Sequence, residues 1–173
     1  MSDSENKLWA PWRIEYVLRE KQDECIFCTK SSPEVNDRND LVLCRGAHSF
    51  VLMNLYPYNN GHLMISPYMH VAAPGEIDDA THLEMVHFMQ QWIAVLRHSM
   101  DPEGFNTGAN LGKVAGAGVE DHYHIHIVPR WVGDTNFMPV TGHTKVLVEA
   151  LEETWDRLTA TYEKIYGSRD KTR

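Results

Sequence analysis

The sequence predicts an α+β fold with about five antiparallel strands and two main helices. Two patterns lead to this prediction: short apolar runs separated by brief turns, and two longer segments whose apolar residues recur at helical spacing. The chain has 173 residues, 43% of them hydrophobic, which is enough for one core. We therefore expect residues 1–173 to form a single domain, with 1–24 as an N-terminal extension, 25–130 as the core of the fold and 131–173 as a C-terminal loop and helix.

The first half of the chain supplies three of the predicted strands. Residues 41–45 and 49–54 indicate two strands, and the short turn that contains Gly46 is a hairpin signal. Residues 62–66 follow a turn-rich loop and indicate a third strand. Because these connections are short, we expect the strands to pair antiparallel. Residues 9–21 before them predict a short amphipathic helix.

The second half supplies two helices and two strands. The clearest helix spans residues 78–100, where Thr81 and Glu84 suggest a capping box. A strand with a glycine-rich exit is expected at 104–112, and another at 122–128, ended by the proline that follows. The apolar positions that mark the first helix are Leu83, Val86, Met89 or Phe88, Trp92 or Ile93, and Leu96; those of a C-terminal helix are Leu147, Leu151, Trp155, Leu158, Tyr162 and Ile165.

Charge and composition narrow the classes of partner. A formal net charge of -8 argues against a nucleic-acid partner, although a local cradle is enough to bind a small phosphorylated ligand. The apolar runs FVLMNL and WIAVL are too short to span a bilayer, so we expect no membrane partner. The polar N-terminus shows no signal peptide, and three cysteines do not suit a disulfide framework. We therefore expect a cytoplasmic protein.

Three histidines alternate with core-type residues in EDHYHIHIVPRW, residues 120–131. Side chains at every second position of a strand share one face. We therefore expect His122, His124 and His126 to face together, away from the core. The intervening residues that we expect to face the core are Tyr123, Ile125 and Ile127.

The spacing of this triad leaves its chemistry open. One ion held by all three rings is awkward, because the α-carbons of His122 and His126 would lie about 13 Å apart on a strand. Two of the rings with ligands from elsewhere remain feasible for a metal site. Alternatively, one neutral imidazole attacks a phosphorus atom while its neighbours donate hydrogen bonds to the phosphoryl oxygens.

Two further motifs are candidates for ligand binding. In KVAGAGV, the small residues Gly116, Ala117 and Gly118 would let backbone N–H groups approach an anion. In CIFC, Cys25 and Cys28 supply two of the four ligands of a structural zinc site, while a redox pair and two buried thiols remain alternatives.

HYHIHIVPR resembles the signature of the histidine triad (HIT) superfamily. The upstream block LMNLYPYNNGHLMISPYMH, residues 52–70, is similar to a second block of that family. The flanking stretches LWAPWRIEYV and PRWVGDTNFMPV look like the branch of diadenosine tetraphosphate phosphorylases. The resemblance implies a HIT-like fold that dimerises by joining its sheets.

The resemblance also implies an activity and roles for individual residues. His124 would be a nucleophile that forms a nucleotidyl-histidine, and His126 and His62 would contact the phosphate. Asn54 would hold the ribose hydroxyls, while Asn110 and the backbone of Gly116, Ala117 and Gly118 would contact phosphate. The expected substrate is diadenosine tetraphosphate, cleaved by phosphate or water. A phosphoramidate or adenylyl-adduct hydrolase, a zinc hydrolase and a catalytically idle nucleotide-binding protein are alternatives.

Zinc-containing relatives imply a ligand set for the CIFC motif, and no organic cofactor is expected. Carried over residue by residue, the zinc ligands would be Cys25, Cys28, His70 and His122. One departure concerns the leaving group. Many family members have Gln, Ser or Thr shortly before the triad, whereas this chain has Gly118 and Val119. The preferred substrate is therefore less well defined by the sequence than the nucleophile.

Overall fold

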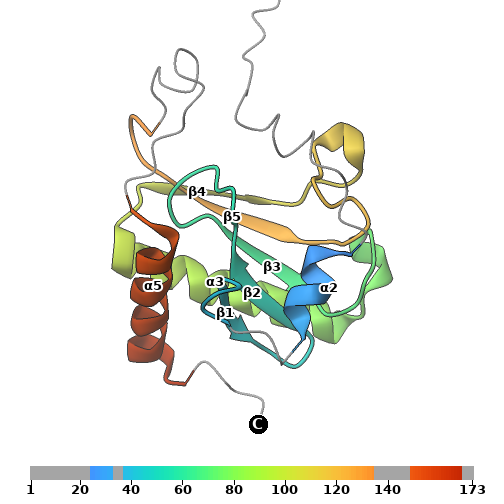
Figure 1. Cartoon of the computed structure of the whole chain (residues 1–173), viewed down its shortest axis with the longest axis horizontal. Helices are drawn as coiled ribbons and strands as arrows, with labels where there is room; N and C mark the ends of the chain where they lie inside the picture. Colours follow the sequence, from blue (N-terminus) through green and yellow to red (C-terminus); the bar gives the residue numbers. More distant parts are fainter. Residues whose placement is uncertain (1–23, 33–36, 135–148, 169–173) are drawn as a thin grey trace, which may run out of the picture.

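A computed structural model of the chain describes residues 24–32, 37–134 and 149–168. Its centre is a five-stranded antiparallel sheet with the strand order β1-β2-β3-β5-β4 (Figure 1). The strands are β1 (Val42–Arg45), β2 (Ser49–Met53), β3 (Leu63–Pro67), β4 (Gly104–Gly108) and β5 (Ile125–Arg130). The helices are α2 (Ile26–Ser31), α3 (Asp79–Met100) and α5 (Leu151–Tyr166), with short 3₁₀ helices η2 (Pro74–Glu76) and η3 (Lys113–Ala115).

The predicted α+β class and the antiparallel sheet are thus confirmed. The helix expected at residues 9–21 and the apolar position Leu147 lie outside the described residues. In the described part of the chain, no helix is both long and apolar enough to cross a bilayer.

Helices cover the two faces of the sheet, so β1, β2 and β3 bury both of their faces, whereas β4 at the edge of the sheet is partly exposed. The main core cluster joins side chains such as Leu43, Ile65 and Ile127 to α3 and α5. A smaller cluster on the opposite face packs against Phe27, which α2 supplies; its strand residues are Val42, Phe50, Leu52 and Met64. Figure 1 shows α2 and α3 on opposite sides of the sheet. The alternation between the clusters is the period of two expected for strands.

Helix α3 begins earlier than its predicted capping box. Its N-cap is Asp78, whose carboxylate accepts the backbone N–H of Thr81 at 2.8 Å. The predicted partner, Glu84, is occupied elsewhere, because its carboxylate accepts the N–H groups of the β1–β2 turn at Ala47 and His48. The predicted apolar stripe was wrong in part: Leu83 and Val86 are exposed, and Met85 and Val95 are buried instead.

Helix α5 follows its predicted pattern closely. Trp155 is buried and donates its indole N–H to the carbonyl oxygen of Val42 at 2.8 Å, which ties the helix to β1. Tyr162 stacks on Trp92 of α3 with ring centroids 4.9 Å apart. Of the predicted apolar positions, Ile165 is exposed.

The strand predicted at 122–128 is shifted along the chain. Strand β5 begins at Ile125 and continues through Pro129. Pro129 pairs with Phe105 of β4. The pairing of β5 with β3 ends at Ile127, two residues before Pro129. Because proline lacks a backbone N–H, its place beyond the end of the β3–β5 pairing costs that pairing no hydrogen bond. The predicted facing is confirmed, because Tyr123 and Ile127 belong to the main core cluster and Ile125 packs against it.

Candidate active site and metal centre

The three triad histidines lie on the α2 side of the sheet. His126 pairs directly with Met64, a residue of the smaller cluster, so both side chains share that face. The rings of His124 and His126 are 4.8 Å apart, and the rings of His62 and His126 are 5.1 Å apart. The structure therefore brings together the three predicted catalytic histidines, one of which, His62, comes from the loop that leads into β3.

One backbone group, the N–H of Tyr58, determines which ring nitrogens carry protons in the His62–His126 pair. The N–H of Tyr58 donates to Nδ1 of His62 at 3.0 Å, so the proton of neutral His62 is on Nε2. That nitrogen lies 2.9 Å from Nδ1 of His126 and donates to it. Neutral His126 therefore carries its own proton on Nε2, where it can be donated to a ligand. The Tyr58 ring also packs on His62, with centroids 4.6 Å apart.

His124 has the opposite arrangement of donor and acceptor. Its Nδ1 lies 2.8 Å from the carbonyl oxygen of His122, which can only accept, so Nδ1 carries the proton and Nε2 has the lone pair. The ring is buried, and burial lowers the pKa of His124, an effect that the hydrogen bond to His122 opposes in part. His124 is therefore a neutral imidazole with an unprotonated Nε2 at neutral pH.

The side chain of His122 points to a different set of partners. Its Nε2 lies 3.0 Å from the carbonyl oxygen of Pro67 and donates to it, which leaves the lone pair on Nδ1. Burial lowers the pKa of His122, the Pro67 carbonyl acts in the opposite direction, and the nearby His70 and His124 lower it further. His122 is thus held as a neutral ring with Nδ1 ready to bind a metal ion.

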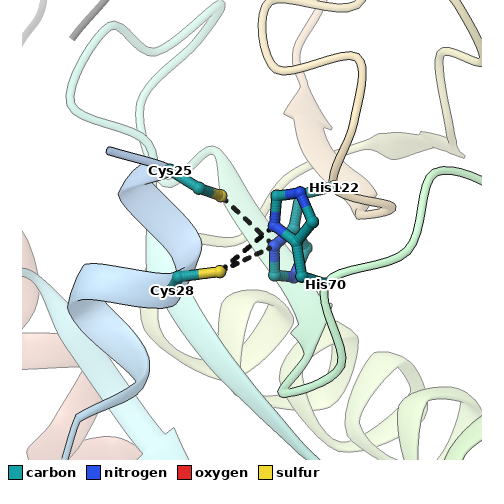
Figure 2. A group of neighbouring side chains, drawn as sticks. All are labelled: Cys25, Cys28, His70 and His122. Atoms are coloured by element: carbon teal, nitrogen blue, oxygen red, sulfur yellow. Dashed lines mark hydrogen bonds between the residues drawn. The ribbon is translucent and has the colours of Figure 1, made fainter. Parts of the chain in front are cut away.

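Nδ1 of His122 and three other ligand atoms, from Cys25, Cys28 and His70, lie close together (Figure 2). Nδ1 lies 3.3 Å from Sγ of Cys25 and 3.6 Å from Sγ of Cys28, and Nδ1 of His70 lies 3.2 Å from Sγ of Cys28. All four atoms are within 4.8 Å of one another. In a tetrahedral site, bonds of about 2.3 Å to sulfur and about 2.0 Å to nitrogen place these atoms about 3.5 Å apart. The four residues could therefore hold a metal ion, and we call them the metal cluster.

Local sequence explains how α2 presents the two thiols. Cys25 is the N-cap of α2, and Cys28 follows one turn later on the same side. Burial raises the pKa of the Cys28 thiol, and the adjacent Cys25 raises it further, so a cation is needed to favour thiolates here. Arg45 of β1 holds the other end of the helix by donating to the carbonyl oxygens of Ser31 and Lys30, each at 3.0 Å.

The predicted nucleotide contacts lie on two loops. Asn54 is half-buried at the end of β2, and its Oδ1 accepts the backbone N–H of Tyr56 at 2.9 Å. Asn110, also half-buried, lies in the segment between β4 and β5 that carries η3. In the same segment Gly116 has φ +86°, a conformation suited to glycine.

Two of the amides proposed as an anion cradle are used within this segment. The N–H of Gly116 donates to the Lys113 carbonyl at 3.0 Å, and that of Ala117 donates to the Gly112 carbonyl at 3.4 Å. Phosphate contact by Gly116, Ala117 and Gly118 therefore stays a prediction.

Sequence reasoning missed two residues that touch the triad. Phe27 lies between the two cysteines, and its ring centroid is 4.6 Å from that of His124 and 5.0 Å from that of His122. Tyr58 precedes His62 by four residues and contacts it through both backbone and ring. No periodic pattern marks either residue; only their positions beside the CIFC motif and His62 could have drawn attention to them.

The sequence that forms this fold matches a known protein family. Residues 36–132, more than half of the chain, match the HIT domain. The chain therefore belongs to the HIT domain family, as its histidine pattern predicted.

Some curated relatives carry names that describe an activity. The AP-4-A phosphorylase of Mycobacterium tuberculosis is 38% identical over 166 residues, which cover 92% of this chain and 85% of that protein. The adenosine 5'-monophosphoramidase of Saccharomyces cerevisiae is 27% identical over 106 residues, which cover 61% of this chain and 62% of that protein.

Two solved structures share the fold. A Zn-bound histidine triad family protein from Mycobacterium smegmatis has a TM-score of 0.66 at 23% identity and covers 82% of this chain and 95% of that chain. A hypothetical histidine triad nucleotide-binding protein from Sulfolobus tokodaii has a TM-score of 0.66 at 22% identity and covers 86% of this chain and 99% of that chain. At these identities the likeness concerns the fold alone.

Proposed function

We propose that this protein cleaves a nucleotide phosphoanhydride through a covalent intermediate on His124, with diadenosine tetraphosphate as the preferred substrate. The observation that carries the proposal is the bond from Nδ1 of His124 to the His122 carbonyl, which leaves the lone pair on Nε2 of a buried neutral ring. A neutral imidazole nitrogen is a competent nucleophile toward phosphorus.

The reaction would proceed in two balanced steps. Nε2 of His124 forms a bond to the α-phosphorus, and the bond from that phosphorus to the bridging oxygen of the leaving nucleotide breaks with its electron pair on oxygen. A water molecule or a phosphate ion then attacks the same phosphorus, and the phosphorus–nitrogen bond breaks, which returns the lone pair to His124. Water would lose a proton in this step, whereas phosphate would become part of a nucleoside diphosphate.

His126 would stabilise negative charge as it develops on the phosphoryl oxygens, and His62 would orient His126. The hydrogen-bond chain from Tyr58 through His62 leaves a proton on Nε2 of His126, next to the ring of His124. Both nitrogens of His62 are engaged in that chain and the side chain is buried. We therefore assign His62 to orienting His126, in place of the direct phosphate contact expected from the sequence.

The remaining predicted residues complete the site. Asn54 would hold the ribose hydroxyls, and Asn110 with the backbone of Gly116, Ala117 and Gly118 would contact phosphates. The metal cluster would hold a structural zinc ion, because two thiolates and two imidazoles fill a tetrahedral zinc site without leaving an open position. A homodimer is expected from the family resemblance and can be tested by light scattering.

The identity to the AP-4-A phosphorylase of M. tuberculosis supports the choice of substrate. The test is a product assay on diadenosine tetraphosphate with and without phosphate. ADP and ATP formed only with phosphate would establish phosphorolysis, and AMP and ATP would establish hydrolysis. Cleavage of adenosine phosphoramidate in preference to both would favour an activity like that named for the yeast relative.

His124→Ala should abolish turnover and the trapping of labelled AMP on the protein while leaving metal content intact. His87→Ala, which changes an exposed histidine of α3, is the matched control. Full activity of His124→Ala would exclude the proposed nucleophile.

A further inference from the structure

Phe27 connects the metal cluster to the ring proposed as the nucleophile. It lies on α2 between Cys25 and Cys28, its side chain is 1% exposed, and its ring contacts both His122 and His124. Its other neighbours are apolar side chains of the sheet: Val42, Phe50, Leu52 and Met64. The ring thus fills the space between the sheet and the two imidazoles.

Two independent connections run from the metal cluster to His124. One is the backbone of His122, whose ring nitrogen belongs to the cluster and whose carbonyl oxygen accepts the Nδ1 proton of His124. The other is α2, which carries two of the four ligands. The same helix places the Phe27 ring in contact with His124, with an angle of 35° between the ring planes. A change in the position of α2 would therefore reach His124 directly through Phe27 and indirectly through the cluster ligand His122.

We propose that Phe27 is a positioning residue for His124 and that the metal cluster sets its place by fixing α2. This inference rests on the proposed role of His124. With the Phe27 ring against it, His124 cannot rotate away from the His122 carbonyl without displacing a buried aromatic side chain. The contact therefore keeps the lone pair on Nε2 and keeps that nitrogen in one orientation.

The helix needs such an anchor because it is short. Helix α2 has only six residues, and an isolated helix of that length is not stable in water. Arg45 holds its C-terminal end through the carbonyls of Lys30 and Ser31. At the N-terminal end, Cys25 makes no side-chain cap bond to the helix, and its thiol instead faces His122. Ligation at Cys25 and Cys28 would fix the end from which Phe27 projects.

The chain offers a matched control for a purely structural role of Phe27. Phe50 belongs to the same cluster and is 0% exposed, but its ring stacks on Tyr68, with centroids 5.5 Å apart. Phe27→Leu and Phe50→Leu should cost similar stability, because both shrink one buried aromatic side chain of the same cluster. A difference between them in catalysis would then report on the contact with His124.

The experiment compares both variants and the metal-depleted wild type by steady-state kinetics and by NMR of the His124 ring nitrogens. For Phe27→Leu we expect kcat to fall about 10- to 100-fold with KM nearly unchanged, because a small misplacement of the nucleophile costs that much. We also expect a mixture of ring tautomers and an unchanged metal content. Phe50→Leu should keep the wild-type kcat and ring signals. Equal kcat and ring signals in the two variants would overturn the role of Phe27.

Metal removal by a chelator tests whether the metal cluster sets the place of Phe27 by fixing α2. The ring signals of His124 in the folded, metal-depleted protein should move toward those of Phe27→Leu; signals that stay at the wild-type values would overturn it. The NMR measurement needs no substrate. If the wild type turned over no nucleotide while its ring signals responded as expected, the proposed function would fail and the positioning role would stand.

Discussion

The two ends of strand β5 hold polar groups in opposite ways. Before its start, burial lowers the pKa of His124, and the hydrogen bond to the His122 carbonyl opposes this effect only in part. After its end, Asp134 also has a lowered pKa, but the first cause is the hydrogen bond from Arg130, which forms an ion pair with it at 2.6 Å. A neutral imidazole keeps a lone pair that is available to bind or attack another atom. A carboxylate held in an ion pair stabilises the fold instead.

The ion pair after β5 is nonetheless linked to the candidate catalytic histidines. Asn59 donates to the carboxylate of Asp134 at 2.7 Å and to the carbonyl of Pro129 at 3.0 Å. Asn59 lies three residues before His62, and the N–H of His62 donates to the Asn59 carbonyl at 3.1 Å. The charged network therefore fixes the loop that delivers His62 to the triad.

The largest effect is expected from removing a ligand of the metal cluster, to which His122 just before β5 belongs. Cys28→Ala should abolish metal binding, because three ligands remain of the four in the cluster. If free metal exceeds the dissociation constant about a thousandfold, the free energy of unfolding should drop by about 4 kcal/mol. Elemental analysis and denaturant titration measure both quantities. Cys44→Ala, which changes a buried cysteine outside the cluster, should keep its metal. Metal bound at wild-type stoichiometry by Cys28→Ala would contradict the ligand assignment.

The next largest effect is expected from removing His62, which links the loop held by Asp134 to His126. His62→Ala should lower kcat about 100-fold, because Nδ1 of His126 then loses its donor and the proton is no longer directed to Nε2. Metal content should not change. The pH–rate profile and kcat of the variant are the measurements, with His98→Ala on α3 as a control at an exposed histidine. A wild-type kcat would show that His126 does not need its partner.

Loss of the Arg130–Asp134 ion pair should change the free energy of unfolding rather than the catalytic rate. Asp134→Asn should lower the free energy of unfolding by about 2 kcal/mol at neutral pH, since the charge-assisted bonds from Arg130 are lost. The pKa of Asp134 is lower in the folded than in the unfolded chain, where 3.8 is ordinary. The stabilisation is therefore complete above pH 3.8 and is lost as the pH falls through the lower folded-state pKa. Denaturation curves of both proteins across the acid range should converge; a constant difference would contradict this account.

Periodicity predicted most of the fold and the facing of the triad, because alternation with a period of two directly reports which side of a strand is buried. It could not place the start of β5, since His122 and His124 alternate in the same way whether or not the ladder includes them. Nor could it predict that Glu84 would bind the β1–β2 turn, because propensity describes only neighbours along the chain.

The residues of the candidate site could be predicted from the sequence, but the protonation of their rings could not. Resemblance supplied residues that the structure brings together, including the four members of the metal cluster. The ring tautomers depend on the carbonyls of His122 and Pro67 and on the amide of Tyr58. Every residue has the same backbone groups, so the residue types do not predict which ring nitrogen carries the proton.

The smallest effect is expected at the turn that joins Asn59 to His62. Gly61 has φ +72°, and an added Cβ would lie 2.7 Å from Sδ of Met100 and 3.0 Å from Cδ2 of Leu96. Gly61→Ala should therefore cost about 1–2 kcal/mol of stability, from left-handed backbone strain together with displacement of a flexible methionine. Because the His62 ring is held separately by Tyr58 and His126, kcat should change less than twofold. Gly75→Ala, at a position open to solvent, is the control for thermal unfolding. A large loss of kcat with little loss of stability would contradict this account. It would mean that the backbone of this turn sets the position of His62, rather than the hydrogen bonds of its ring to Tyr58 and His126.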